Sequence, residues 1–156
     1  MNLDQKFGII KISKRIIIYT TKHFFLFKPF PSISPSHFII ASIREVENRF
    51  DYLTNEEIMD YSEIVNYSIS NLEAYYKCAA SNIIINEMKN SHFHTNLVIR
   101  NDDFADEIYN KINNFSIEKE IEGDNLEKIS CEVNDIQGFI IKSSYENYTN
   151  KENHDI

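Results

Sequence analysis

The sequence is poor in the residues that build several common kinds of site. Its 156 residues include two cysteines, three glycines, three prolines and no tryptophan. Cys78 and Cys131 lack metal-ligand spacing, so we expect free thiols and no structural zinc site. No glycine occurs between Gly8 and Gly123, and a backbone nest for phosphate needs residues that tolerate positive φ. A complete glycine-rich phosphate loop is therefore not expected in the middle of the chain.

Basic clusters and long apolar runs are also missing. The formal net charge is −8, and no cluster of lysine and arginine offers a surface for nucleic-acid backbone. No apolar run approaches the ~18 residues of a membrane span, and residues 1–6 have no apolar core of signal-peptide length. We therefore expect a cytoplasmic protein that binds neither nucleic acid nor a membrane.

The overall composition of the chain suits one globular domain. Hydrophobic residues make up 42% of the chain and charged residues 26%, which is ordinary for a folded protein with a real core. Residue patterns predict a series of strands and two helices. The expected strands are 9–12, 15–20, 23–28, 38–43, 81–86, 92–100, 129–133 and 136–142, and the expected helices are 55–78 and 102–113. The short connection after residue 86 predicts an antiparallel hairpin with the 92–100 strand.

The order of these elements predicts an α+β fold with a largely antiparallel sheet of about five or more strands. The long helix should begin after Thr54, because Glu57 completes a capping box with it. We expect the domain to span residues 1–142. The polar residues 143–156 are expected to form a disordered tail.

The most informative segment runs from Ser91 to Arg100. It alternates polar and apolar residues with period two, so His92, His94 and Asn96 should share one face of a strand. Imidazole is the side chain best suited to proton transfer and nucleophilic attack near neutral pH. Taken alone, a His-x-His pair is a weak signal and favours a half-exposed strand that has no catalytic role.

The order of the motifs resembles the histidine triad (HIT) family, whose signature is His-x-His-x-His followed by apolar residues. Residues 24–31 resemble the family's apolar strand and proline-containing turn, and residues 35–37 resemble its Pro-Gly-His. Residues 104–109 resemble the short helix of the fragile-histidine-triad branch. The resemblance covers residues 7–113 and implies a HIT-like fold with one long helix and one short helix.

The resemblance also implies roles for single residues. In HIT enzymes the middle histidine, here His94, attacks the α-phosphate of a nucleotide and forms a nucleotidyl-histidine intermediate that water hydrolyses. His92 would orient its neighbours, and His37 would support the triad from the next strand or serve as a satisfied core histidine. Asn96 replaces the third histidine. It keeps a donor but cannot carry positive charge or shuttle a proton.

Two further residues are candidates for substrate binding because of where they match the family. Asn86 begins the segment in which HIT proteins carry a glycine-rich phosphate turn. Lys28 lies near the position of the asparagine that binds ribose in the family. The resemblance thus implies a substrate site made of His37, Asn86 and Lys28 beside the three triad positions.

The leading hypothesis is a hydrolase of dinucleoside polyphosphates, such as diadenosine triphosphate, or of nucleotide conjugates. A nucleotidyltransferase is the enzymatic alternative, because that related branch has a carboxamide at the third triad position. A catalytically silent HIT protein that binds a nucleotide or a protein partner is the alternative from another class. We expect a homodimer and no bound metal site or resident cofactor, while Mg²⁺ or Mn²⁺ is compatible with a polyphosphate substrate.

Overall fold

The structure, a computed structural model, describes residues 3–85, 88–100 and 105–154. In chain order the elements are β1 (Gln5–Phe7), β2 (Ile10–Ile12), η1 (Lys14–Ile16), β3 (Ile17–Thr20), β4 (Phe24–Phe27), β5 (His37–Ser42), β6 (Glu47–Asn48), η2 (Phe50–Tyr52), α1 (Asn55–Tyr76), β7 (Ala80–Ile84), β8 (Met88–His92), β9 (His94–Arg100), α2 (Ala105–Asn113) and α3 (Gly123–His154).

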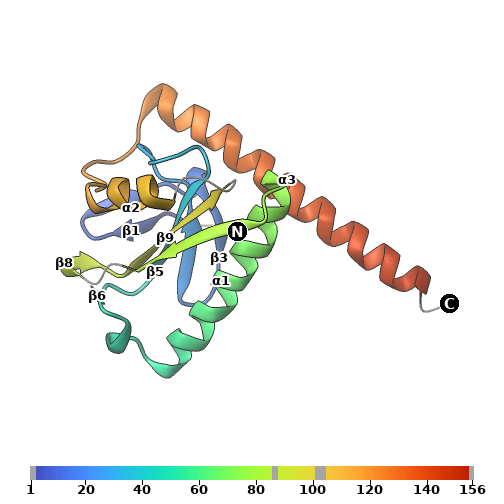
Figure 1. Cartoon of the computed structure of the whole chain (residues 1–156), viewed down its shortest axis with the longest axis horizontal. Helices are drawn as coiled ribbons and strands as arrows, with labels where there is room; N and C mark the ends of the chain where they lie inside the picture. The colour runs from blue at the N-terminus through green and yellow to red at the C-terminus, as the bar shows by residue number, and fades with distance from the viewer. Residues whose placement is uncertain (1–2, 86–87, 101–104, 155–156) are drawn as a thin grey trace.

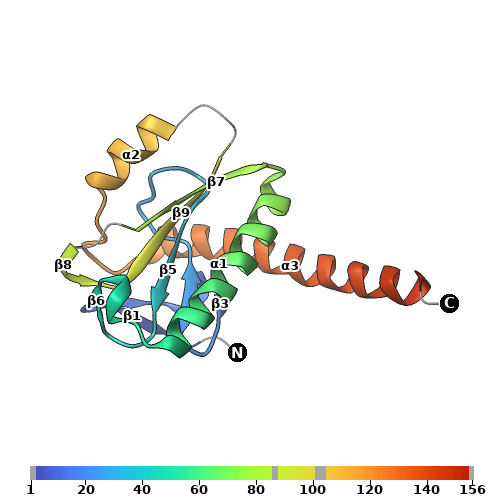
Figure 2. The same cartoon turned by 60° about the horizontal axis from the view of Figure 1, so that its bottom comes forward.

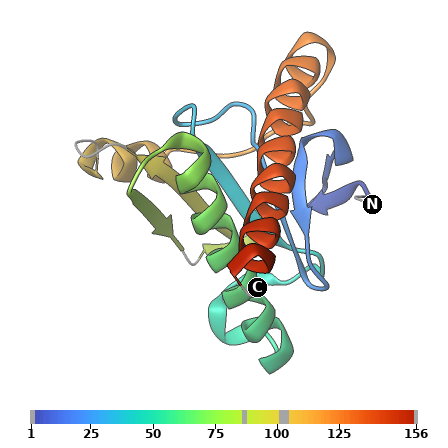
Figure 3. The same cartoon turned by 90° about the vertical axis from the view of Figure 1, so that its right-hand side faces the viewer.

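Five strands form one antiparallel sheet in the order β3-β4-β5-β9-β7. The helices α1 and α3 lie along one face of this sheet, as Figure 3 shows. The β1–β2 hairpin and α2 lie on the other face (Figures 1 and 2). This arrangement confirms the predicted α+β class and the antiparallel sheet. The predicted hairpin partner of β9 is also confirmed, because β7 pairs with β9.

The two faces of the sheet are separated by side-chain alternation along β4. Phe24 packs against Tyr61 of α1, with ring centroids 5.5 Å apart. Phe27, three residues on, packs against Phe7 of the hairpin at 6.1 Å. All four residues of β4 have no exposed surface, because both faces of the sheet are covered. The hairpin side of the sheet is therefore closed over rather than open to solvent at this strand.

The predicted start of α1 is confirmed in detail. The amide of Glu57 donates to the Thr54 hydroxyl at 3.1 Å, and the amide of Thr54 donates to the Glu57 carboxylate at 2.9 Å. The Arg44 guanidinium donates to the same carboxylate at 2.7 Å, and this contact is the main reason that the pKa of Glu57 is lowered. The capping box thus ties α1 to the segment after β5.

The strands predicted at 129–133 and 136–142 are wrong, because this segment belongs to α3. Its buried hydrophobic residues are Ile129, Val133, Ile136 and Ile140, each at most 7% exposed. Their spacing of four, three and four residues is that of one helix face. The β-branched side chains favoured the strand prediction, but burial of this face against α1 and β3 outweighs that preference.

The same helix continues through the predicted domain boundary at residue 142. Its backbone is helical as far as His154, where a disordered tail was expected from residue 143. The last turns of α3 project beyond the rest of the molecule (Figures 1 and 2), and Ile141 and Tyr145 are about 70% exposed there. The chain therefore has two long helices instead of the single one expected. Within the described residues, no helix combines the length and apolarity that crossing a membrane requires.

Candidate active site

The predicted common face of His92 and His94 is confirmed. Phe93 lies between β8, which ends at His92, and β9, which begins at His94. The Phe93 ring points to the α1 side, where it lies 5.8 Å from the ring of Tyr61. Both imidazoles point to the hairpin side, because the Phe7 ring lies 5.4 Å from His92 and 5.1 Å from His94.

The His94 ring is oriented as a nucleophile requires. Its Nδ1 lies 2.7 Å from the carbonyl oxygen of His92, which can only accept, so Nδ1 carries the proton. Nε2 of the neutral ring then carries the free electron pair. Burial lowers the pKa of His94, which keeps the ring neutral near pH 7. The backbone amide of His94 donates to the side-chain oxygen of the fully buried Asn48 at 3.1 Å.

His92 is held at both ring nitrogens. Nδ1 accepts from the amide of Gly8 at 3.3 Å, and Nε2 donates to the carbonyl of Ser42 at 2.6 Å. Burial lowers the pKa of this ring too, against the opposite effect of its bond to Ser42. His92 therefore serves to position His94 through its own carbonyl, and its side chain ties the N-terminal hairpin to β5.

His37 and Asn96 form a second pair on the same face. The amide of Ile33 donates to Nδ1 of His37 at 3.2 Å, so this nitrogen has no proton. Nε2 of His37 therefore donates to the side-chain oxygen of Asn96 at 2.9 Å. Burial lowers the pKa of His37 to about 4. The carboxamide of Asn96 is thus held with its oxygen toward His37, which leaves its NH₂ group as the available donor.

The structure places the predicted substrate residue Lys28 away from this site. Lys28 is 1% exposed, and its ammonium donates to the carbonyl of His37 at 2.9 Å. It also lies 4.9 Å from the ring centroid of Phe38, which packs on the α1 side of the sheet. Burial lowers the pKa of Lys28 to about 8. Its placement supports the strand and does not suit substrate binding, while Asn86 lies outside the described residues.

Three residues at the site could not be assigned from the sequence. Phe7 covers both imidazoles, Ser42 fixes His92, and Asn48 fixes the backbone of His94. Ser42 and Asn48 lie about 50 positions from their partners in the chain, so no local pattern signals these contacts. The sequence signs of the hairpin were the predicted strand 9–12 and the pairs Phe7-Gly8 and Ile10-Lys11, which also fit the family branch.

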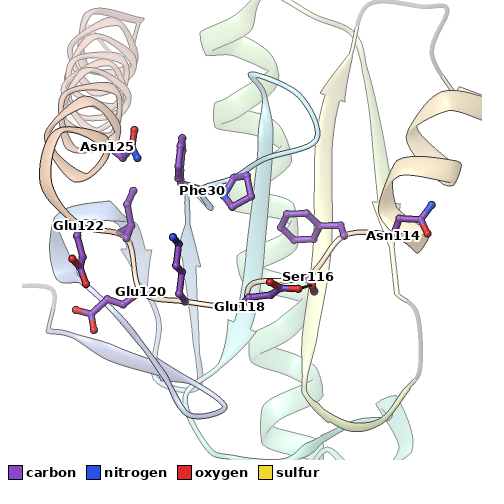
Figure 4. A pocket seen from close by; sticks show the side chains of 11 residues that line it. Phe30, Asn114, Ser116, Glu118, Glu120, Glu122 and Asn125 are labelled. Atoms are coloured by element: carbon purple, nitrogen blue, oxygen red, sulfur yellow. Dashed lines mark hydrogen bonds between the residues drawn. The ribbon is translucent and has the colours of Figure 1, made fainter.

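The cavities of the molecule lie beside this site rather than over it. The largest, about 640 Å³, lies between the turn at Phe30 and the segment 114–122 (Figure 4). There Ser116 donates to Glu118, while Glu120 and Glu122 point away from Phe30. A cavity of about 420 Å³ lies near Arg100 at the far end of β9. Neither of these two cavities is lined by His92, His94 or Asn96.

Phe115 separates the largest cavity from the histidines. Its ring lines that cavity and lies edge-on to His37, with centroids 4.8 Å apart. The cavity wall is thus one aromatic ring away from the His37–Asn96 pair. In the parts of the chain that the structure describes, no group of three histidine, cysteine or carboxylate side chains could hold a metal ion.

Solved structures show what this arrangement is similar to. The Plasmodium falciparum diadenosine triphosphate hydrolase, solved with Cyclomarin A, matches with a TM-score of 0.72 and 20% identity over 91% of this chain and 87% of that one. The C. elegans NitFhit protein matches with a TM-score of 0.70 and 19% identity over 89% of this chain, which spans only 31% of that longer protein. A hypothetical histidine triad nucleotide-binding protein from Sulfolobus tokodaii matches with a TM-score of 0.57 and 14% identity, over 81% and 84%.

Sequence comparison adds nothing to these matches: no family model and no curated protein matches the chain. At identities of 14–20% the structural matches establish the fold and no activity. The chain therefore has the fold of the histidine triad proteins. Its own residues have to carry any argument about chemistry.

Proposed function

We propose that the protein hydrolyses dinucleoside polyphosphates or nucleotide conjugates through a nucleotidyl intermediate on His94. The observation that carries the proposal is the bond from His94 Nδ1 to the His92 carbonyl. It fixes the tautomer in which Nε2 is a nucleophile. The lowered pKa of His94 keeps that electron pair available at neutral pH.

The first step forms a bond between Nε2 of His94 and the α-phosphorus, and the leaving group departs with the electron pair of its bond to phosphorus. The imidazole then carries a positive charge, which the His92 carbonyl stabilises through Nδ1–H. Water next attacks the phosphorus, and the electron pair of the P–N bond returns to Nε2. The proton of the attacking water passes to solvent. The NH₂ group of Asn96 is the donor available to a phosphate oxygen.

The Phe7 ring packs against the His94 imidazole and would form part of the wall of a nucleotide pocket at Nε2. It lies 5.1 Å from the His94 ring centroid. The hairpin that carries it is a separate two-stranded sheet, attached by the 3.3 Å bond from Gly8 to His92, by an exposed ion pair from Lys11 to Glu120 and by the packing of Phe7 and Ile12 on the core. Exposed ion pairs contribute little, about 0–1 kcal/mol. Apolar packing is therefore the main attachment of the hairpin.

The test is direct. Purified protein is incubated with diadenosine triphosphate, with and without Mg²⁺ or Mn²⁺, and nucleotide products are separated by chromatography. The expected result is release of AMP and ADP by the wild type and a mass increase of one nucleotidyl group on the peptide with His94. Product formation without any dependence on His94 would contradict the covalent route.

A silent nucleotide-binding or protein-binding role is the second candidate. The observations that favour it are the covered histidines and Asn96 at the third position. Binding of a labelled nucleotide without turnover or adduct would support it. A nucleotidyltransferase rests only on the carboxamide of Asn96. Transfer of the nucleotidyl group to an added phosphate acceptor, faster than to water, would distinguish it from a hydrolase.

A homodimer stays part of the proposal. Aromatic residues of α1 give it little support because they pack within the chain: Tyr67 stacks on Tyr19 at 3.9 Å and Tyr75 lies 5.5 Å from Phe139 of α3. The remaining support is the β7 edge of the sheet, where Ile83 and Ile85 are 46% and 38% exposed. A single monomeric species in analytical ultracentrifugation at micromolar concentration would contradict a dimer.

A further inference from the structure

The two imidazoles nearest the reaction have no proton to give to a leaving group. The proton of His94 lies on Nδ1, on the opposite side of the ring from Nε2, and is held by the His92 carbonyl at 2.7 Å. The proton of His92 lies on Nε2 and is held by the Ser42 carbonyl at 2.6 Å, while Nδ1 of His92 accepts from Gly8. Every ring nitrogen of this pair except Nε2 of His94 is therefore engaged within the fold.

The third position cannot supply a proton either. A carboxamide donates hydrogen bonds but does not release a proton at neutral pH, and Asn96 occupies the position of the third imidazole. The one proton of His37 is committed to the Asn96 oxygen at 2.9 Å, on a side chain with no exposed surface. Burial lowers the pKa of His37 to about 4, so the pair is neutral near pH 7.

The described residues that pair with His94 and Asn96 on β5, and the ring that packs on His94 from the hairpin, are apolar. On β5 the residues paired with His94 and Asn96 are Ala41 and Ile39, and Phe7 covers His94 from the hairpin. The ammonium of Lys28 lies on the other side of the sheet. Among the described side chains that bond to or stack on His92, His94 and Asn96, none offers a transferable proton.

From this arrangement, and resting on the proposed function, we infer that the site takes nucleotide substrates whose leaving group departs as a stable anion. Phosphate anhydrides and acidic aryl esters belong to this class. Phosphoramidates do not, because an amine leaves phosphorus only when its nitrogen receives a proton.

The atom balance of the first step explains the selectivity. The Nε2–P bond forms while the bond from phosphorus to the leaving atom breaks, and the electron pair stays on that atom. An anhydride or an acidic phenol holds this pair as an anion. An amine nitrogen would have to leave as an amide anion unless it gained a proton, and a positioned acid typically contributes ~10²–10⁴-fold to such a step. Without that acid the P–N bond breaks far more slowly.

The test compares substrates that differ only in the leaving group. The full chain is given AMP esters of phenols of increasing pKa, beginning with the 4-nitrophenyl ester, and adenosine 5′-phosphoramidate. We expect kcat/KM to fall about tenfold for each unit of phenol pKa, and phosphoramidate cleavage to lie about 10³-fold below the 4-nitrophenyl ester. A flat series, or a phosphoramidate cleaved as fast as the nitrophenyl ester, would overturn the inference while leaving the proposed function intact.

Two variants sharpen the result. Asn96→His restores a side chain that can carry a proton and should raise the ratio of phosphoramidate to nitrophenyl-ester cleavage about 100-fold. Asn96→Gln is the matched control, since it keeps a carboxamide and should keep the low ratio. The ratio is measured within one preparation, so a reduced folded fraction does not affect it. Equal ratios in both variants would overturn the inference, and failure of the wild type to release nitrophenol from any ester would overturn the proposed function with it.

Discussion

Two hydrogen-bonded pairs lie on the same face of the sheet and differ in what they leave free. In the His92–His94 pair, one nitrogen with an electron pair remains available, and the ring of Phe7 packs against its imidazole. In the His37–Asn96 pair, only an amide NH₂ remains, and the ring of Phe115 separates it from the largest cavity. The first pair thus keeps a nucleophilic nitrogen, whereas the one proton of the second pair is committed to the bond within the pair.

Replacing the nucleophile of the His92–His94 pair should have the largest effect on activity. His94→Asn should abolish the nucleotidyl adduct and turnover, because no neighbouring group can form the same bond, while nucleotide binding stays largely intact. Mass spectrometry of the intact protein after incubation with diadenosine triphosphate measures the adduct. His23→Asn is the control, since His23 lies near Glu56 at 3.8 Å and should retain the adduct. An adduct in the His94 variant would place the chemistry elsewhere.

The His37–Asn96 pair should make the unfolding free energy depend on pH in the acid range. The pKa of His37 is lowered from 6.5 to about 4 by burial, so the unfolded chain binds a proton that the folded chain does not. Stability from this neutral ring is fully present above pH 6.5, falls as pH drops toward 4 and is lost below it. The shift corresponds to about 3 kcal/mol. Between pH 7 and 4, the unfolding free energy measured with urea should change by about 3 kcal/mol less in His37→Gln than in the wild type. The same slope in both proteins would refute a buried neutral His37.

The two aromatic rings that pack on the pairs, Phe7 and Phe115, should differ in their effect on the chemical accessibility of His94. Phe7→Ala should raise the rate at which diethylpyrocarbonate modifies His94 by about tenfold, the effect expected when ~1.4 kcal/mol of covering contact is lost. Phe115→Ala should leave that rate nearly unchanged, because Phe115 packs on His37. Peptide mass spectrometry over a time course measures both rates. If both variants raised the modification rate of His94 equally, the two rings would not act separately on the two pairs.

The smallest effect is expected from the cap of α1, which supports both pairs only from the opposite face. Thr54→Ala removes the hydroxyl that accepts from the Glu57 amide and should cost about 1 kcal/mol of unfolding free energy. Thermal and urea unfolding measure it. The leaving-group preference and the adduct on His94 should be unchanged. A change in either would mean that the two faces of the sheet are coupled.

The two pairs also differ in how well the sequence predicted them. Alternation in the segment 91–100 was enough to place His92 and His94 on one face, because strand geometry is local. The neutral state of the His37–Asn96 pair depends on the amide of Ile33 and on burial from distant segments, and neither can be read from a motif. Lys28 was assigned to the substrate from its place in the resemblance, but one position along a strand decides which face a side chain takes.

The elements of the fold also differ in how well the sequence predicted them. The capping box and the amphipathic face predicted α1 closely, since both signals lie within the helix itself. In α3 the strand preference of isoleucine and valine competed with helical spacing at Ile129, Val133 and Ile136. Packing against β3 and α1 decides that competition, and such packing is visible only once the chain is folded.

The side chain of Gln137 has a consequence for how copies of the chain can associate. It donates from α3 to the carbonyls of Ile17 and Ile18, at 3.2 Å and 3.1 Å, and so occupies acceptors on the outer strand β3. Unpaired acceptors on an outer strand invite another chain to extend the sheet. With β3 obstructed and β7 at the opposite end of the sheet, strand-to-strand joining is available at one end only. Two copies that meet through β7 would therefore close into a finite pair, and stacking of further copies into a fibre would stop there.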